Sequence, residues 1–260
     1  MTKKNRTLSI LSIAGSDNSC GAGIQADIKT AHSLKSYCLT VVTCITSQNS
    51  KEVSKVFSLP IKIVLSQVKT ILKDFYIDAV KIGLITDHKI ALPLSKILSR
   101  INVPIIVDPI YKSSIGKKFI KKEHFIHTHK VLSKIAKIYT PNFQEGLILA
   151  QLNNGNISKN ELVEKIFRDY KTPIVLTGGD DKDKYSRDIL INNFGLKEYK
   201  SRKISSHNTH GTGCSFSTAL SIYLAKGLDI NDSIFKAKKY VEKGIKKSPF
   251  LNLEYGPIGH

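Results

Sequence analysis

Short apolar runs rich in β-branched residues recur along the chain, and segments with helical spacing separate them. Six of these runs have the length and composition of buried strands, namely 8–14, 40–45, 79–82, 105–107, 138–140 and 174–177. Apolar residues recur at helical spacing in four segments, namely 61–72, 158–170, 216–224 and 234–245. Strands that alternate with helices predict an α/β fold, in which a mostly parallel central β-sheet is flanked by helices on both faces.

Local signals refine these elements. Ser158 and Glu161 form a capping-box pattern at the start of the second helical segment, and Gly227 is placed to end the helix that begins near 216. Residues 188–204 predict a hairpin that turns around 192–195. Since no low-complexity linker or internal repeat divides the chain, we expect one domain over residues 1–260.

The chain is strongly basic, with 40 Lys and Arg against 21 Asp and Glu and a formal net charge of +19 over 260 residues. This charge makes nucleic acid the first partner to consider. Only five of the basic residues are arginines, and the lysines are scattered, whereas bidentate recognition of bases favours arginine. We therefore expect no nucleic-acid partner, and we expect the charge to attract small anionic substrates.

The composition also bears on the compartment. No run of 18 apolar residues exists, so we expect no transmembrane segment and no membrane partner, and the apolar start at 8–14 is interpreted as a first strand rather than a signal peptide. The four cysteines, Cys20, Cys38, Cys44 and Cys214, form no Cys-x-x-Cys pair and no zinc-type spacing. This pattern predicts a reducing, cytoplasmic environment.

Ligands on parallel sheets bind beyond the carboxyl ends of the strands, so the loops after the strands are the places to search for chemistry. After the first strand, Gly21-x-Gly23-x-x-Ala26 matches a relaxed dinucleotide fingerprint, but the acidic residue that a nicotinamide site needs is absent from 45–49. The loop is either a glycine turn that leads into a helix or a close approach of backbone to a small polar ligand. In the second case Asp27 and Gln48 supply directional hydrogen bonds.

Two further loops carry candidate groups. Pro141 ends the fifth strand, and Asn142 with Glu145 forms either a plain helix cap or a pair of oxygen ligands that faces a hydrated Mg²⁺. Gly178 and Gly179, after the sixth strand, allow backbone to approach a ligand closely.

The most informative segment is His210-Gly211-Thr212-Gly213-Cys214, which opens the helix near 216. Glycines at a helix start leave N–H groups pointing outward, and with the helix dipole they form an anion site suited to a phosphoryl group in transfer. A first-turn thiol has a lowered pKa, so Cys214 is a candidate base for an attacking hydroxyl. The alternative is a buried cysteine beside a glycine turn. No P-loop motif and no Gly-x-Ser-x-Gly elbow is present.

Taken together, the motifs resemble the bacterial hydroxymethylpyrimidine/phosphomethylpyrimidine kinases of thiamine biosynthesis, in the ribokinase-like superfamily. The motifs that carry the resemblance are Ala14-Gly-Ser-Asp17, Gly21-Ala-Gly-Ile-Gln-Ala-Asp27, Ser47-Gln-Asn49, Lys81-Ile-Gly83, Asp108-Pro109, Thr140-Pro-Asn-x-x-Glu145, Gly178-Gly179, Thr209-His-Gly-Thr-Gly-Cys214 and Gly256-Pro257. They extend over essentially the whole chain. The resemblance implies a ribokinase-like fold, a homodimer, and ATP with Mg²⁺ as cofactors. It also implies phosphorylation of 4-amino-5-hydroxymethyl-2-methylpyrimidine to its monophosphate and then to its diphosphate.

The resemblance also implies roles for individual residues. Its pyrimidine-site positions are Gly15, Ala22, Asp27 and Gln48, with Asp27 and Gln48 bonding the amino group and ring nitrogens, and with Leu84 and Ile110 flanking the ring. Its phosphate and nucleotide positions are Asp108, Asn142, Thr177, Gly178 and Gly179, with Asp108 and Glu145 near the metal through water. Gly211, Thr212 and Gly213 match the anion hole, and Cys214 matches the catalytic base.

The sequence departs from the family pattern in three places. The family usually has Lys-Gly-Gly-His after the sixth strand, whereas this chain has Thr177-Gly-Gly-Asp180, which removes a charge near the transferred phosphate. Slower turnover, above all in the second step, is the expected result. Cys20 replaces a usual glycine and Tyr111 a smaller residue or Met.

Three other functions stay open from the sequence. They are a pyridoxal kinase, a non-catalytic pyrimidine-binding protein that lacks the lysine at 177, and a nicotinamide oxidoreductase that uses Gly21-x-Gly23.

Overall fold

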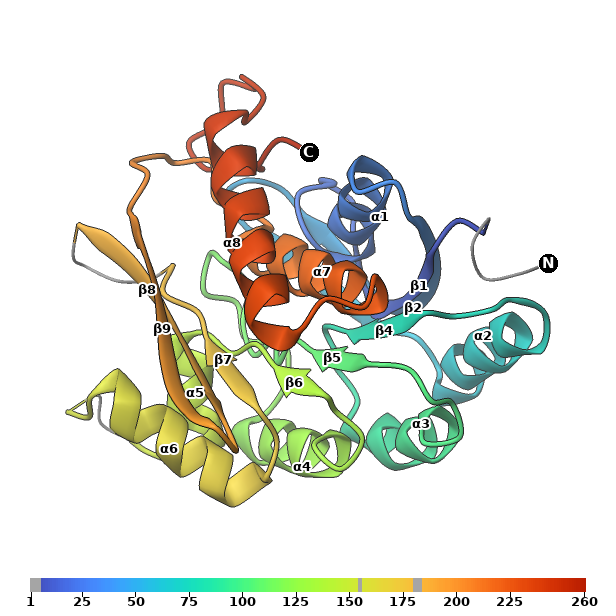
Figure 1. The fold of residues 1–260 in the computed structure, drawn as a ribbon. Coiled ribbons are helices and arrows are strands. Elements are labelled where there is room, and N and C mark those ends of the chain that lie inside the picture. Colours follow the sequence, from blue (N-terminus) through green and yellow to red (C-terminus); the bar gives the residue numbers. More distant parts are fainter. Residues whose placement is uncertain (1–5, 154–155, 180–183) are drawn as a thin grey trace.

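The computed structural model describes residues 6–153, 156–179 and 184–260, so Asp180 lies outside the described residues. Its centre is one sheet of nine strands in the order β3-β2-β1-β4-β5-β6-β7-β8-β9 (Figure 1). The strands are β1 (Ser9–Asp17), β2 (Tyr37–Gln48), β3 (Val53–Ser58), β4 (Ala79–Ile82), β5 (Ile105–Val107), β6 (Ile138–Tyr139), β7 (Ile174–Leu176), β8 (Tyr185–Asn192) and β9 (Gly195–Arg202).

The six central strands pair in parallel, in the sheet order β2-β1-β4-β5-β6-β7. Their carboxyl ends therefore lie at one edge of the sheet. The outer strands β3, β8 and β9 pair antiparallel to their neighbours. The predicted hairpin is confirmed as β8 and β9, which turn at Asn192 and Gly195. The mostly parallel α/β prediction is therefore confirmed.

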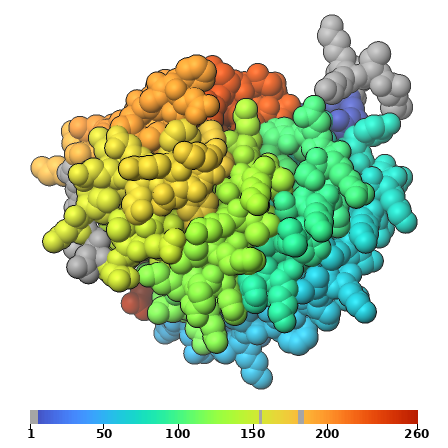
Figure 2. Space-filling view, turned by 90° about the horizontal axis from the view of Figure 1, so that it is seen from below, coloured from blue at the N-terminus to red at the C-terminus, as the bar shows by residue number. Residues whose placement is uncertain are grey.

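Helices cover both faces of the sheet (Figure 1). One face carries α1 (Gly23–Ser33), α7 (Thr212–Ala225) and α8 (Ile230–Lys246). The other carries α2 (Ile61–Asp74), α3 (Ala91–Leu98), α4 (Lys122–Leu132), α5 (Phe143–Leu149) and α6 (Lys159–Tyr170), and Figure 2 shows the continuous surface that these helices form.

Alternation along the strands divides the apolar core between the two faces. Leu11 and Ile13 pack in the larger cluster with α2 to α6, whereas Ile10 packs with Ala31 of α1 and Ile222 of α7. Ile106 lies between Ile105 and Val107 of the larger cluster in the sequence, but it packs on the other face of the sheet with Phe216 of α7. Burial on both faces explains why these strands are continuous apolar runs rather than alternating ones.

Several predicted boundaries are confirmed. Ser158 and Glu161 form the capping box of α6, and Gly227 follows the end of α7 with a φ of +83°, which glycine adopts at little cost. The sequence analysis missed β3, α3 and α4. Helix α4 carries two buried polar residues, Thr128 and His129, on its inner face, so its apolar pattern is weak.

In the described part of the chain, no helix combines the length and the apolar character needed to cross a bilayer.

Candidate active site

A cavity of about 620 Å³ opens at the carboxyl ends of the parallel strands. Its size lies within the range of small-molecule sites. The predicted site residues that line it are Gly15, Ala22, Gln48, Leu84, Asp108, Ile110, Asn142, Glu145, Thr177, Gly179, Gly211, Thr212, Gly213 and Cys214. Asp27 and Gly178 are the predicted site residues that do not line it.

The loop before α7 packs tightly against the loop after β1. Gly211 has a φ of +83°, and a Cβ placed there would lie 1.9 Å from the Gly21 carbonyl oxygen. A Cβ at Gly21 would in turn lie 2.0 Å from the His210 ring. The glycines of the first loop are thus required by contacts within the protein, and these contacts bring the start of α7 to the cavity.

Helix α7 begins at Thr212, directly at the cavity wall. The first N–H groups of a helix have no intrahelical acceptor, and the helix dipole favours negative charge at this end. Gly211, Thr212 and Gly213, called here the anion loop, lie at this helix start on the cavity wall. The Thr212 N–H donates to the Thr209 carbonyl at 3.3 Å, and the binding of an anion by this loop stays a prediction.

Asp17, at the end of β1, joins the two loops and was missed by the sequence analysis. Its Oδ2 accepts hydrogen bonds from His210 Nε2 at 2.9 Å, Ala22 N at 2.8 Å and Gly21 N at 3.1 Å. Burial raises the pKa of this carboxyl, but the hydrogen bonds, above all that of His210, outweigh burial and hold the pKa well below its usual range. The position of Asp17 at the carboxyl end of a strand is the feature of the sequence that could have identified it as a site residue.

Asp108, at the end of β5, is buried and lines the same cavity. Its carboxylate accepts hydrogen bonds from Ser217 Oγ of α7 at 3.1 Å and from Thr140 Oγ1 at 3.4 Å. Burial raises the pKa of Asp108, while Lys81 and these hydroxyls oppose the rise. The group is therefore poised to gain from a cation placed in the cavity.

Asn142 and Glu145 form the capping box of α5, so the helix cap is present, and their predicted metal-facing role stays a prediction. Glu145 Oε2 accepts from Asn142 N at 3.0 Å, and Oε1 accepts from Tyr111 N at 3.3 Å. Both residues also line the cavity. Within the described ranges, no group of three or more His, Cys, Asp or Glu side chains could hold a metal by itself.

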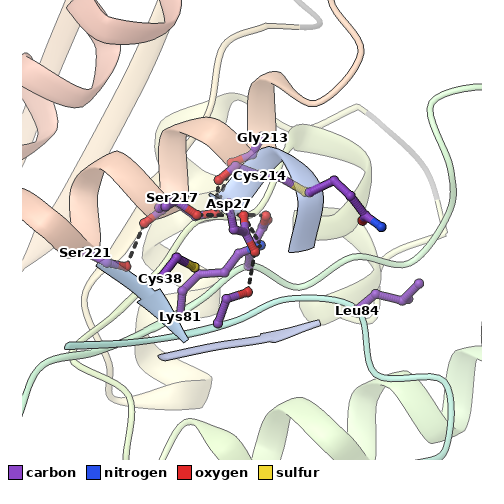
Figure 3. Close-up of polar contacts among 12 residues, drawn as sticks. Asp27, Cys38, Lys81, Leu84, Gly213, Cys214, Ser217 and Ser221 are labelled. Carbon is purple, nitrogen blue, oxygen red and sulfur yellow. Dashed lines mark hydrogen bonds and ion pairs between the residues drawn. The ribbon is translucent and has the colours of Figure 1, made fainter. Parts of the chain in front are cut away.

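The burial of Asp27 corrects the prediction that this residue contacts the pyrimidine. Its side chain in α1 is fully buried, and both carboxylate oxygens lie 3.0 Å from Lys81 Nζ of β4 (Figure 3). Ser12 of β1 and Thr218 of α7 also donate hydroxyl hydrogen bonds to it. Asp27 therefore ties four elements together beneath the cavity and has no surface for a ligand.

Gly178 corrects a second prediction. A Cβ at this position would lie 2.4 Å from the Arg187 backbone, so the glycine is required by strand β8 and not by a ligand. Its N–H donates to Asp188 Oδ1 at 2.7 Å. Thr177 and Gly179, on either side, do line the cavity.

Cys214 lies in the first turn of α7, as predicted, but its thiol is not acidified. Burial raises the pKa of Cys214 to about 12, and the nearby Lys81 only partly opposes this shift. The helix-start effect assumed from the sequence applies to thiols in contact with water, whereas Cys214 is buried. The resting group is a neutral thiol at neutral pH.

The comparisons with known proteins agree with this geometry. The sequence model of the phosphomethylpyrimidine kinase family matches residues 17–259. The chain belongs to this family. The resemblance that the motifs suggested is therefore confirmed, and the two glycines of the nicotinamide hypothesis have an explanation within this kinase fold.

Two relatives of this kinase differ in length. A hydroxymethylpyrimidine/phosphomethylpyrimidine kinase of Aquifex aeolicus is 33% identical over 248 residues, which cover 94% of this chain and 97% of the relative. The thiamine biosynthesis bifunctional protein ThiED of Geobacter sulfurreducens is 34% identical over 97% of this chain, which spans only 52% of that relative.

Two solved structures share the fold of this kinase. The ADP complex of Bacillus subtilis pyridoxal kinase superposes with a TM-score of 0.89 at 30% identity and covers 98% of each chain. The phosphomethylpyrimidine kinase of Clostridium difficile 630 gives 0.79 at 32% identity, over 92% of this chain and all of its own. The ribokinase-like fold prediction is confirmed.

The Lys81–Asp27 ion pair generates a stability prediction for this kinase. Burial lowers the pKa of Lys81, but Asp27 more than reverses this effect, so removal of the lysine leaves a buried, uncompensated carboxylate. Lys81→Met should lower the free energy of unfolding, measured by urea denaturation, by about 3–5 kcal/mol.

The matched control is Lys165→Met, because Lys165 pairs with Asp169 at 3.1 Å on the exposed side of α6. That change should cost less than about 0.5 kcal/mol. A Lys81→Met variant as stable as Lys165→Met would contradict the role given to the pair.

Proposed function

We propose that the chain transfers a phosphoryl group from ATP to the hydroxymethyl group of 4-amino-5-hydroxymethyl-2-methylpyrimidine, and then a second one to the monophosphate. The family and the Aquifex relative of matching length support this activity. One observation carries it: the anion loop at the start of α7 opens into the same cavity as the apolar and amide side chains suited to a ring.

The ring end of the cavity offers few but directional groups. Leu84 and Ile110 supply apolar surface, and the Gln48 side chain can both donate and accept hydrogen bonds. Gly15 and Ala22 contribute backbone there. Because Asp27 is enclosed, Gln48 is left as the side chain of that pair to distinguish an aminopyrimidine from other rings.

The phosphate end combines fixed donors with carboxylates. Phosphoryl transfer spreads charge over the equatorial oxygens and depends on positioning and electrostatic stabilisation. The N–H groups of the anion loop are held in place by the Gly211–Gly21 contact and by the Asp17–His210 hydrogen bond, so they need no rearrangement during transfer.

A hydrated Mg²⁺ suits the residues at this end. Mg²⁺ binds through one or two carboxylates together with substrate phosphates and keeps several waters. Asp108 and Glu145 provide such oxygens at adjacent strand ends, where both residues line the cavity. Bound with the nucleotide, the ion would neutralise phosphate charge.

Cys214 is proposed as the acceptor of the hydroxyl proton. In this step the thiolate takes the proton, the substrate oxygen bonds to phosphorus, and the bond from phosphorus to ADP breaks. Since the thiol is neutral at rest, only a small fraction of the enzyme holds the thiolate at neutral pH.

Pyridoxal kinase is the second candidate, because two of the structural matches with TM-scores of 0.89 are pyridoxal kinases. Pyridoxal also carries a ring hydroxymethyl group. By analogy with the family we further propose a cytoplasmic homodimer that has neither nucleic acid nor membrane as a partner.

The activity is tested by ADP release from purified protein with Mg-ATP and the pyrimidine alcohol, beside pyridoxal. We expect two equivalents of ADP per pyrimidine. A Cys214→Ala variant should release ADP at least about 100-fold more slowly, since general-base catalysis contributes factors of that order.

The outcomes separate the alternatives. One equivalent would mean that the second step fails, and release with pyridoxal alone would transfer the assignment to a pyridoxal kinase. Ligand binding without ADP release would identify a non-catalytic binding protein. Binding of NAD would support the oxidoreductase hypothesis instead.

A pH profile tests Cys214 as the base. The parameter kcat/KM reports groups of the free enzyme, and a thiol whose pKa is about 12 gains thiolate about tenfold per pH unit well below that value. Between pH 7.5 and 9.5, above the titration of the phosphates, log kcat/KM for the pyrimidine should rise with a slope near one.

The Cys214→Ala variant is the control, and its residual activity should show no such slope. A flat profile for the unmodified enzyme would exclude the Cys214 thiolate as the base.

A further inference from the structure

The 111–119 loop, which follows β5, crosses the cavity between its two phosphate-facing sides. On one side, Tyr111 N donates to Glu145 Oε1 at 3.3 Å. On the other, Ser114 Oγ lies 3.4 Å from His210 Nδ1, next to the anion loop. The short segment between these contacts therefore joins the Glu145 side of the cavity to the His210 side, next to the anion loop.

The loop is itself closed by backbone hydrogen bonds. Ser113 N donates to the Lys117 carbonyl at 2.8 Å, Phe119 N donates to that of Tyr111 at 3.0 Å, and Lys112 pairs antiparallel with Lys118. Lys112 lies within the anchored segment and lines the cavity, whereas Lys118 does not line it. The two lysines thus share a loop and a charge but differ in access to the cavity.

Among the described residues, four cationic side chains line the cavity: Lys112, Arg202, Lys203 and Lys238. Lys238 is neutralised by Asp188, whose Oδ2 lies 2.9 Å from its Nζ. Arg202 and Lys203 lie at the end of β9, the edge strand, away from the central strands. Lys112 follows β5, in the centre of the sheet, and among the described residues it has no carboxylate within 4 Å of its ammonium group.

The Glu145 carboxylate, which accepts the hydrogen bond from Tyr111 N, also connects the 111–119 loop to Thr177. Asn142, whose N–H donates to the same carboxylate, pairs with Thr177 in a parallel bridge, and Thr177 N donates to the Pro141 carbonyl at 2.9 Å. Lys112 and Thr177 therefore lie on the same phosphate-facing region, one carrying a charge and the other lacking it.

We propose that Lys112 is a catalytic residue that contacts the transferred phosphoryl group and supplies the positive charge that Thr177 does not. The proposal rests on the proposed function and names the cation that its phosphate end requires. A lysine ammonium acts there as a compact point charge with three donors, which suits a phosphoryl group whose charge is spread over three oxygens.

A double-mutant cycle tests this proposal by kcat for ADP release. Lys112→Met should lower kcat about 100- to 1,000-fold, the order expected for loss of one transition-state donor, and Lys112→Arg should retain most of the rate. Thr177→Lys should restore at least about tenfold to the kcat of Lys112→Met.

Lys117→Met is the matched control, because Lys117 belongs to the same loop, does not line the cavity and, unlike Lys118, is not the bridge partner of Lys112. It should stay within about twofold of the unmodified enzyme, and thermal unfolding should show that all variants fold.

Three results would overturn the assignment while leaving the proposed function intact. They are a Lys112→Met rate within twofold of the unmodified enzyme, equal losses in Lys112→Met and Lys117→Met, and a loss that Thr177→Lys does not reduce. An unmodified enzyme that releases no ADP with either alcohol would overturn the proposed function and this assignment with it.

Discussion

The buried ion pair between Asp27 and Lys81 is the interaction on which the rest of the site depends. It joins helix α1 to strand β4 (Figure 3). The hydroxyls of Ser12 and Thr218 extend it to β1 and α7. Helix α7 delivers the anion loop, and α1 continues the loop after β1, so the pair sets the relative position of both walls. Both side chains of the pair are fully buried, so removal of either partner leaves an uncompensated buried charge and lowers the stability of the fold.

Above this pair, the cavity wall sets the protonation of its groups by two opposing effects. Asp17 stays ionised because several hydrogen bonds, first among them that of His210, outweigh its burial. At Asp108 and Cys214 burial prevails, so the pKa of each is raised. The wall therefore combines an ionised carboxylate with buried groups whose pKa values lie above their usual range.

The sequence predicted the sheet and most of its helices because strands buried on both faces leave long apolar runs. It predicted the anion loop for a similar reason, since Gly211 can be recognised from its place ahead of an apolar helix. Asp27 misled because a motif position does not say whether a carboxylate faces a ligand or a lysine such as Lys81, 54 residues away in the chain. The predicted low pKa of Cys214 is wrong because the thiol is buried. The glycine at 178 is explained by the backbone of strand β8, which follows it in the chain and packs against it.

The central claim is that the phosphoryl group passes to the ring alcohol inside this cavity rather than to water. The most direct measurement is ³¹P NMR of the unmodified protein with Mg-ATP and the pyrimidine alcohol. The account predicts a phosphomonoester signal coupled to the methylene protons, followed by the paired signals of a diphosphate ester. Inorganic phosphate with no ester signal, or an unchanged ATP spectrum, would contradict it.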